Sequence, residues 1–368
     1  MTSYWSNKKV FLTGHTGFKG SWFLLLLRQL GANVFSYSLP PDKSSSLFEE
    51  LCASNDFLKS LDHTYGDIKD LDCLSKSVQS FDPDIVFHFA AQPLVIQSYA
   101  DPLDTWNTNV IGTLNLLSSL QKIGHKCSIV IITTDKVYQN HQWSFGYREI
   151  DQLGGDDPYS ASKAACELAV KSWYKSFCGS LHFQNPDISI ATARAGNVIG
   201  GGDWASNRIV PDSVRALSSG EPIRIRNPLS TRPWQHVLEP LHGYLALAKH
   251  IHENDSPAYD SFNFGPLLAS NRTVKELTDT ILSIWPGHSI IESDSQQPPE
   301  SKLLHLSIDK AVTTLNWRPL WDFNETVSRT VNWYKTYNDG RAAIDCCLED
   351  LRYYNLCLDA DSEFEQRF

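Results

Sequence analysis

A tyrosine and a lysine one helical turn apart are the residues of this sequence best suited to acid–base chemistry. Tyr159 and Lys163 occupy positions i and i+4 of a predicted helix, so their side chains share one face. A neighbouring ammonium group favours the phenolate and lowers a phenol pKa that starts at about 10. Because a phenolate can take the proton of an alcohol, we predict that Tyr159 is a general base supported by Lys163.

A glycine-rich segment near the N-terminus predicts a phosphate-binding turn. It reads Gly14-His-Thr-Gly17-Phe-Lys-Gly20, follows the apolar run 10–13 and leads into an apolar helix. Glycine permits a tight turn and lets a pyrophosphate approach the N-terminus of the helix, whose free N–H groups attract anions. At the first strand–helix junction of an alternating pattern, this spacing indicates a dinucleotide site.

Two acidic residues are candidates for the adenosine half of the dinucleotide. Asp42 follows the second predicted strand, where an acid usually binds the ribose, although a solvated loop residue is an equal alternative. Lys43 alone is a poor argument for a 2′-phosphate site. Asp67 follows the third strand and is positioned to meet the adenine, with helix capping as the alternative.

Strands and helices that alternate along the chain must position these residues. Continuous apolar runs indicate strands covered on both faces, and their alternation with helical segments indicates parallel pairing. The runs lie at residues 10–13, 33–37, 64–66, 85–89, 128–133 and 188–194. We predict an α/β fold with a Rossmann-type doubly wound parallel sheet, a smaller C-terminal substrate-binding domain, and ligands beyond the carboxyl ends of the strands.

The pattern along the chain also predicts a division into domains. Residues 1–196 are expected to form the dinucleotide-binding domain and to carry the catalytic residues. Residues 197–340, rich in Gly, Pro, Arg and Trp, are expected to form mainly the substrate-binding domain, with some strands and helices returning to the first domain. Residues 341–368 form a tail of unknown role.

Composition excludes several kinds of partner. The chain has 368 residues, 42% of them hydrophobic, and its 32 basic and 42 acidic residues give a net charge of −10, so nucleic acid is not an expected partner. We expect no membrane association and a cytoplasmic location, because the sequence shows neither a signal-peptide layout nor about 18 consecutive apolar residues. The eight cysteines show no C-x-x-C spacing, which predicts reduced thiols and no metal site.

Several of these segments resemble the extended short-chain dehydrogenase/reductase superfamily that acts on nucleotide sugars. The resemblance lies in the glycine turn, Ala90-Ala91-Gln92, Asn109, Thr134 and the Tyr159/Lys163 pair. Over about residues 8–335, longer strings resemble the CDP-glucose 4,6-dehydratase family. These strings are HTGFKGSW (15–22), AAQPLV (90–95), RAGNVIGGGDW (194–204), IRNPLSTRPWQHVLEPL (225–241) and NFGP (263–266).

This resemblance implies NAD as the cofactor and a sugar nucleotide, CDP-glucose, as the substrate. The residues it implies for NAD are Gly14, Thr16, Gly17, Phe18, Lys19, Gly20, Asp67, Ile68, Ala90, Ala91, Gln92, Asn109, Tyr159 and Lys163. Arginines suited to a pyrophosphate gather in the second half of the chain, at Arg194, Arg208, Arg224, Arg226 and Arg232. The resemblance favours Arg208 and Arg232, with Asn197, while a surface ion pair is the alternative for each arginine.

The tripeptide Thr134-Asp135-Lys136 ends the fifth predicted strand and faces the same crevice as Tyr159. An acid and a base there would flank a bound sugar; a capping Asp and a surface Lys are the alternatives. The related dTDP-glucose dehydratases carry Asp-Glu here, and the resemblance implies that Asp-Lys marks the CDP-glucose branch. The family string TSDKCY reads TTDKVY, and neither change removes a titrating group from the proposed pair.

We predict a redox-neutral dehydration. Tyr159, helped by Lys163 and Thr134, removes the 4-hydroxyl proton as hydride leaves C4. Asp135 then protonates the departing C6 hydroxyl, and Lys136 assists deprotonation at C5 or stabilises the enolate. The alternatives are a nucleotide-sugar 4-epimerase, which needs no elimination pair, and a catalytically silent NAD-binding protein.

The helices predicted around residues 104–120 and 159–173 carry apolar residues on more than one face, which indicates that each is buried somewhere. They resemble the pairing surface of the superfamily, so we predict a homo-oligomer, with a dimer favoured. Burial entirely within one chain is the alternative.

Overall fold

The computed structural model describes residues 2–41, 46–53, 61–178, 187–254, 256, 258–292 and 303–365. The predicted ribose-binding Asp42, and Lys43 beside it, lie outside the described residues.

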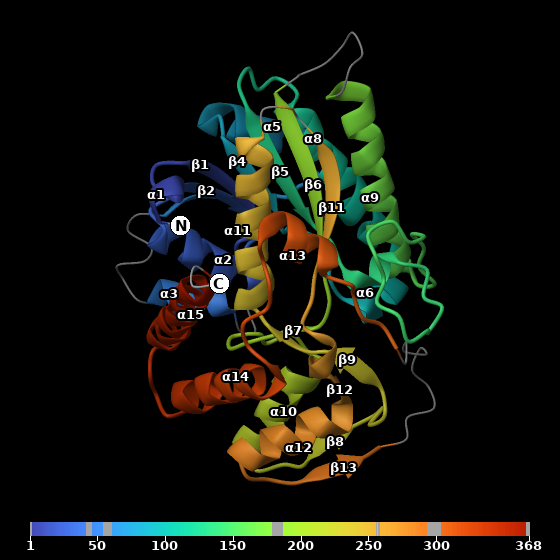
Figure 1. Ribbon diagram of the computed structural model, residues 1–368, viewed down its shortest axis with the longest axis vertical. Helices are drawn as coiled ribbons and strands as arrows, with labels where there is room; N and C mark the ends of the chain where they lie inside the picture. The colour runs from blue at the N-terminus through green and yellow to red at the C-terminus, as the bar shows by residue number, and fades with distance from the viewer. Residues whose placement is uncertain are drawn as a thin grey trace.

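A parallel sheet forms the centre of the molecule (Figure 1). Its seven strands lie in the order β11-β6-β5-β4-β1-β2-β3. They are β1 (Lys9–Thr13), β2 (Asn33–Ser38), β3 (Asp62–Tyr65), β4 (Ile85–His88), β5 (Cys127–Ile132), β6 (Ile188–Ala195) and β11 (Tyr259–Phe264). The order reverses between β1 and β4, which is the arrangement of a doubly wound sheet, so the predicted fold class is confirmed.

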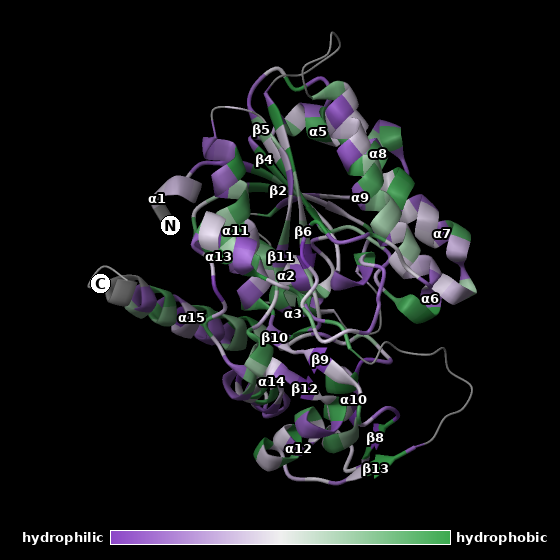
Figure 2. Ribbon diagram, turned by 45° about the vertical axis from the view of Figure 1, so that its right-hand side comes forward, coloured by the Kyte–Doolittle hydropathy of each residue, from purple (hydrophilic) through white to green (hydrophobic). Residues whose placement is uncertain are grey.

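Helices cover both faces of the sheet, which explains why β4, β5 and β6 are buried along their whole length. On one face, α2 (Phe18–Gln29) and α11 (Leu238–Glu253) share a large hydrophobic cluster. On the other face, α5 (Leu71–Phe81), α8 (Gly112–Leu120) and α9 (Pro158–Phe177) contribute to a second cluster. Figure 2 shows these two layers on opposite sides of the strands.

A smaller region lies beyond the carboxyl end of β6 (Figure 1). Its elements are β7 (Val198–Ile199), α10 (Ile209–Ser218), β8 (Ile223–Ile225), β9 (Thr231–Pro233), β10 (Gln235–His236), η3 (Leu268–Ser270), β12 (Asn271–Thr273), α12 (Val274–Ile284) and β13 (Ser289–Ile291). β7 pairs with β10, β8 with β13 and β9 with β12. Between these segments the chain returns to the main sheet through α11 and β11.

The C-terminal residues fold as helices. α13 (Asp309–Leu315) lies near β11 and α11, while α14 (Phe323–Asn338) packs on α12 and on α15 (Ala343–Glu365). α15 is anchored by Tyr354, whose hydroxyl donates to Glu239 Oε2 at 2.6 Å. Burial raises the pKa of Glu239 to about 7, with the Tyr354 hydrogen bond opposing it. The tail, for which the sequence shows no motif, therefore belongs to the hydrophobic core.

Short helices complete the chain: α1 (Thr2–Trp5), α3 (Leu47–Ala53), α6 (Val95–Ala100), α7 (Pro102–Trp106), η1 (Asn107–Ile111) and η2 (Asp135–Val137). All eight cysteines fall within the described ranges and are free thiols. No helix in the described part of the chain is long and apolar enough to cross a membrane. The described residues also contain no group of three or more His, Cys, Asp or Glu that could hold a metal ion.

Candidate active site

The glycine turn joins β1 to α2 at the carboxyl edge of the sheet. Gly14 has a φ of +78°, and a Cβ there would lie 2.6 Å from the backbone nitrogen of Ala90. A Cβ at Gly20 would overlap the carbonyl oxygen of Gly14. A Cβ at Gly17 would have that same oxygen as its nearest neighbour, at 3.5 Å, so this position faces open space. Gly14 and Gly20 therefore close the turn, and Gly17 leaves room at the start of α2.

The start of α2 fits a dinucleotide pyrophosphate. Gly17 is the N-cap residue of α2 and provides no capping side chain, so the first N–H groups of the helix can bind an anion. Thr16 ties the turn to the end of β2, because its hydroxyl lies 2.7 Å from Ser38 Oγ and donates to Leu39 O at 3.0 Å. The turn is thus a rigid cradle that a side chain at Gly17 would begin to fill.

Lys19 extends from this cradle toward the catalytic residues. Its pKa is lowered to about 8, chiefly by burial and then by the charge of Arg208. Lys163 and Lys136 add smaller lowering effects, and Asp135 opposes them. The sequence resemblance assigns Lys19 to the cofactor alone. The charges around it place it between the glycine turn and the proposed elimination pair.

The loop after β4 forms the second wall of the crevice. Asn109 accepts a hydrogen bond from Gln92 N at 2.9 Å and donates to Gln92 O at 3.2 Å. It also donates to Ser162 Oγ on α9 at 2.9 Å. Asn109 therefore ties Gln92, which follows Ala90 and Ala91 in this loop, to the helix that carries Tyr159.

Asp67 and Ile68 follow β3 at the far end of the same edge. Asp67 accepts from Lys69 N at 2.9 Å, an interaction of the turn it starts, and its side chain is 35% exposed. Ile68 is buried, and a Cβ at Gly112 would lie 2.6 Å from the Ile68 Cδ1 atom. The Oδ2 of Asp67 also lies 3.4 Å from Lys69 Nζ, so both carboxylate oxygens of Asp67 have local partners.

Tyr159 and Lys163 lie in the first turns of α9 and are both buried. Asp157 caps this helix by accepting from Ser160 N at 2.9 Å, which holds the first turn in place. Thr134 hydrogen-bonds to the phenol of Tyr159, while Lys163 Nζ donates to Ile132 O at 3.4 Å. Tyr159, Lys163 and Thr134 therefore meet at the end of β5, as the spacing predicts.

The electrostatics of Tyr159 differ from the expectation based on spacing alone. Burial raises its pKa to about 12, with the Thr134 hydrogen bond acting against the shift. Burial also lowers the pKa of Lys163, and the Lys163 side chain points toward a backbone carbonyl. The lowered phenol pKa predicted from the i, i+4 pair is wrong, because desolvation is the largest influence on the phenol and the cation that opposes it is Arg208.

Asp135 and Lys136 open the η2 turn directly after β5. Thr134 is the N-cap of this turn, which removes the capping interpretation of Asp135. The Asp135 side chain is 1% exposed; its Oδ1 accepts from Thr134 Oγ1 at 3.1 Å and lies 3.6 Å from Lys136 Nζ. Its Oδ2 is buried without a hydrogen-bond partner among the described residues. A buried carboxylate oxygen left unpaired at a strand end indicates a ligand-facing group.

The predicted substrate residues differ in their surroundings. Arg208 donates to Asp203 Oδ2 at 2.9 Å, and its charge acts on both Lys19 and Tyr159, so it lies at the crevice. Asn197 has a buried Oδ1 without a partner in the described part of the chain. Arg232 lies on β9 and donates to Thr231 O at 2.8 Å.

Other arginines of the predicted set lie elsewhere. Arg224 is 62% exposed and forms an ion pair with Glu292, the surface alternative stated for each arginine. Arg194 is buried and pairs with Glu167 on α9, so it is occupied inside the protein.

Several residues that support the crevice carry no sequence motif. Thr13 Oγ1 lies 2.7 Å from His88 Nδ1 and accepts from Ala90 N at 3.2 Å. Ser98 Oγ accepts from Tyr159 N at 3.2 Å. Their only sequence signal is position, because Thr13 and His88 end the strands that flank the switch point of the sheet.

Comparison with known proteins identifies the family. The model of the GDP-mannose 4,6 dehydratase family matches residues 11–330. The chain belongs to this family. Within it, the chain is 41% identical over 353 residues to CDP-glucose 4,6-dehydratase of Salmonella typhimurium, covering 96% of this chain and 97% of the relative. The resemblance predicted from the sequence strings is confirmed by this match.

The chain is also similar to more distant proteins, one by sequence and two by fold. UDP-glucose 4-epimerase of Mycoplasma genitalium is 23% identical and covers 90% of this chain and 98% of its own. The structure of dTDP-glucose 4,6-dehydratase from Bacillus anthracis in complex with NAD superposes with a TM-score of 0.75 at 20% identity, covering 90% of this chain and 97% of that one. UDP-glucose 4-epimerase of Thermotoga maritima with UDP-glucose gives the same TM-score at 20% identity, covering 89% and 99%.

Proposed function

We propose that this protein is a CDP-glucose 4,6-dehydratase, which converts CDP-D-glucose to CDP-4-keto-6-deoxy-D-glucose with NAD as its bound cofactor. The observation that carries the proposal is the pair Asp135 and Lys136, which follows Thr134 beside Tyr159. An oxidation at C4 needs only the tyrosine, while loss of water from C5 and C6 needs an additional acid and base. The 41% identity to the Salmonella enzyme supports the nucleotide assignment.

The glycine turn would hold the cofactor pyrophosphate. When bound, NAD supplies the hydride acceptor for C4, the hydride donor for C6 and a positive charge beside Tyr159. Gly14, Gly17 and Gly20 shape the cradle, with Thr16, Phe18 and Lys19 around it. The remaining proposed contacts are Asp67, Ile68, Ala90, Ala91, Gln92, Asn109, Tyr159 and Lys163.

Tyr159 starts the reaction by taking the proton of the 4-hydroxyl. Its raised pKa means that the phenol stays protonated until positive charge gathers around it. Lys163 supplies one such charge from the same helix face, and Thr134 orients the phenol through its hydrogen bond. The ketone formed at C4 then acidifies the C5 proton.

Asp135 and Lys136 carry the elimination. Asp135 donates a proton to the departing C6 hydroxyl, which leaves as water. Lys136 removes the C5 proton, directly or through a water molecule, or remains protonated and stabilises the enolate while a water or Tyr159 takes that proton. A proton returns to C5 when the hydride adds to C6. The side chain of Lys136 is 35% exposed and that of Asp135 is 1% exposed, with Lys136 Nζ 3.6 Å from Asp135 Oδ1.

Arg208, Arg232 and Asn197 hold the sugar nucleotide in this proposal. Asp203 orients the Arg208 guanidinium through contacts of 2.9 and 3.2 Å. A guanidinium fixed in this way can bind a diphosphate with two parallel hydrogen bonds.

We infer that the protein forms a homodimer. Exposed apolar side chains gather on α7, η1 and α9, which pack on one another: Leu103 is 76%, Ile111 48% and Leu168 58% exposed. Light scattering should give twice the chain mass, and Leu168→Glu should shift it toward the monomer. Leu356→Glu, on α15 and 66% exposed, is the control that should leave the mass unchanged.

The proposal extends to domain roles and location. Residues 1–196 would bind NAD and carry the catalytic groups, residues 197–340 would mainly bind the sugar nucleotide, and the role of 341–368 is packing. A cytoplasmic location is consistent with the eight free cysteines, because reduced thiols are usual in that compartment.

Incubation of the purified protein with CDP-, dTDP-, UDP- and GDP-glucose tests the function. We expect loss of one water molecule and a 4-keto-6-deoxy product with CDP-glucose above all. A product of unchanged mass with inverted C4 would indicate an epimerase, and absence of turnover with every sugar nucleotide would indicate a silent NAD-binding protein.

A further inference from the structure

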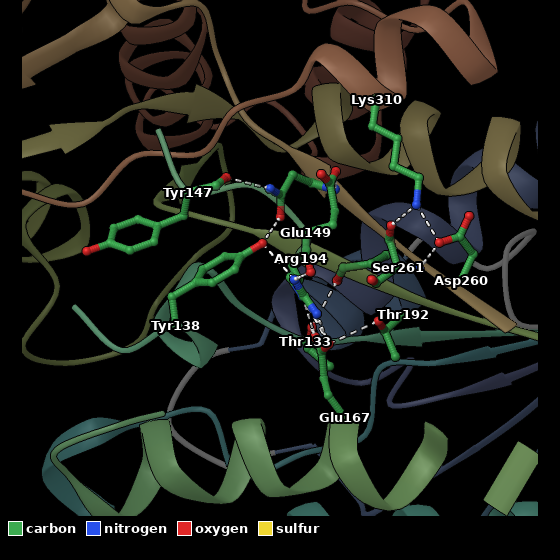
Figure 3. A network of polar contacts seen from close by, with 12 residues as sticks. Thr133, Tyr138, Tyr147, Glu149, Glu167, Thr192, Arg194, Asp260, Ser261 and Lys310 are labelled. Atoms are coloured by element: carbon green, nitrogen blue, oxygen red, sulfur yellow. Dashed lines mark hydrogen bonds and ion pairs between the residues drawn. The ribbon is translucent and has the colours of Figure 1, made fainter. Parts of the chain in front are cut away.

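A buried ion pair joins Glu167 on α9 to Arg194 on β6 (Figure 3). Glu167 is four residues beyond Lys163 on α9 and is 1% exposed. Arg194, near the end of β6, is 2% exposed, and its Nε donates to both carboxylate oxygens of Glu167 at 2.8 and 3.0 Å. A second nitrogen, Nη2, also contacts Glu167 Oε2. The pair is therefore bidentate, an arrangement that fixes orientation as well as charge.

Further hydrogen bonds from two neighbouring strands reach the same carboxylate. Thr133 Oγ1 donates to Glu167 Oε1 at 2.7 Å from the residue after β5. Thr192 Oγ1 donates to Oε2 at 3.2 Å from β6. Both threonines are buried. Replacing either one with valine removes one hydroxyl contact to Glu167.

The guanidinium of Arg194 also contacts Tyr138, which lies beyond the other end of the Thr134–Lys136 tripeptide. Its Nη1 donates to the Tyr138 hydroxyl at 2.6 Å, and its Cζ lies 4.9 Å from the centre of the Tyr138 ring. The Tyr138 hydroxyl in turn donates to Asn263 Oδ1 on β11 at 2.8 Å. In Figure 3, Arg194 lies between Tyr138 and the Glu167 carboxylate that rises from α9.

Thr133 directly precedes the tripeptide Thr134-Asp135-Lys136, and Tyr138 follows the tripeptide after one intervening residue. The ion pair therefore binds both flanks of the tripeptide. Asp135 depends on this support, because its Oδ2 has no hydrogen-bond partner among the described residues. It also packs closely on the residue that follows β6, since a Cβ at Gly196 would lie 2.8 Å from that oxygen.

We propose that Glu167 and Arg194 are positioning residues that hold the Thr134–Lys136 segment in register for the elimination of water. They do not reach the crevice themselves, because both are buried and engaged with each other. This inference rests on the proposed dehydration and deepens it. A small displacement of reacting groups can lower a rate by about a hundredfold, so loosening one flank should be measurable.

The test compares two valine variants that each remove one hydroxyl from Glu167. Thr133→Val loosens the flank of the tripeptide, whereas Thr192→Val loosens β6 and serves as the matched control. Single-turnover reactions with CDP-glucose follow reduction of bound NAD and, separately, formation of the 6-deoxy product. Melting temperatures of both variants are recorded. Tyr138→Phe is a second variant on the other flank.

Thr133→Val and Tyr138→Phe should slow formation of the 6-deoxy product by about tenfold to a hundredfold while NAD reduction changes less than about twofold. Thr192→Val should show no such difference between the two half-reactions, even if its melting temperature equals that of Thr133→Val. Equal slowing of both half-reactions, or the same split in Thr192→Val, overturns the inference and leaves the pair a support of the fold. Failure of the wild-type enzyme to form any 6-deoxy product contradicts the proposed function instead.

Discussion

Lys136 Nζ lies 3.6 Å from Asp135 Oδ1, so the two groups assigned to the elimination are ion-paired with each other. The pair is asymmetric, because the Asp135 side chain is 1% exposed and that of Lys136 is 35% exposed. Loss of Lys136 would leave a buried carboxylate without its nearest cation, whereas loss of Asp135 would leave a cation that water can still reach. Substitutions at the two positions should therefore stop the reaction in different ways.

Lys136→Met should stop the reaction after oxidation. Bound NAD should still be reduced by CDP-glucose, since Tyr159 is untouched, but elimination should slow by about 10² to 10⁴. Mass spectrometry of the quenched reaction in heavy water should find a 4-keto sugar that keeps its C6 hydroxyl and carries no deuterium at C5. Lys171→Met, an exposed lysine on α9, is the control. Release of the 6-deoxy product at an undiminished rate would remove Lys136 from the mechanism.

Asp135→Asn should stop the reaction one step later. The amide is nearly the same size but cannot give a proton to the departing hydroxyl, so water loss should fall by about 10² to 10⁴. Because Lys136 remains, the trapped 4-keto sugar should exchange its C5 proton with heavy water. A variant that neither reduces NAD nor exchanges C5 would show that Asp135 acts before the elimination.

Tyr159→Phe should abolish oxidation while leaving NAD and substrate binding nearly intact. Since burial raises the phenol pKa to about 12, the phenolate becomes more populated as the pH rises. The wild-type rate of NAD reduction should therefore increase with pH until the phenol of the bound complex has titrated. Stopped-flow absorbance of the reduced nicotinamide measures both effects. Wild-type rates in Tyr159→Phe, or a rate that falls with pH, would contradict the assignment.

Binding of NAD should weaken as the pH rises past the pKa of Lys19. That pKa is lowered to about 8, chiefly by burial and then by Arg208, so the side chain is an ammonium below this pH and a neutral amine above it. Titration calorimetry at several pH values should show a loss of affinity through this range, and Lys19→Met should bind about tenfold more weakly and without this dependence. The same titration with CDP separates a cofactor role from a substrate role. Persistence of the pH dependence in Lys19→Met would assign it to another group.

The main sheet could be predicted because burial on both faces leaves a continuous apolar pattern. The runs at 10–13 and 85–89 correspond to β1 and β4 within one residue at each end. Strand β11, with the sequence Tyr-Asp-Ser-Phe-Asn-Phe, has no such signal because it lies at the edge of the sheet and its first half is only partly buried. Edge strands commonly carry polar and charged residues.

The relative positions of the candidate site residues were predictable where they depend on local spacing. Tyr159 and Lys163 are one turn apart in any helix, and Asp135 and Lys136 are adjacent in sequence. The approach of Lys19 to Asp135 and the pairing of Arg194 with Glu167 depend on contacts across the sheet, which spacing does not encode. The phenol pKa could not be predicted either, since it depends on how deeply α9 buries Tyr159.

The central claim is that hydride leaves C4 and returns to C6 of the same sugar within one active site. CDP-glucose labelled with deuterium at C4 tests it directly when the product is analysed by NMR and mass spectrometry. We predict that the label is retained and appears in the C6 methyl group of CDP-4-keto-6-deoxyglucose. Loss of the label to solvent, or its recovery at C4 of an unchanged or epimerised sugar, would contradict the account.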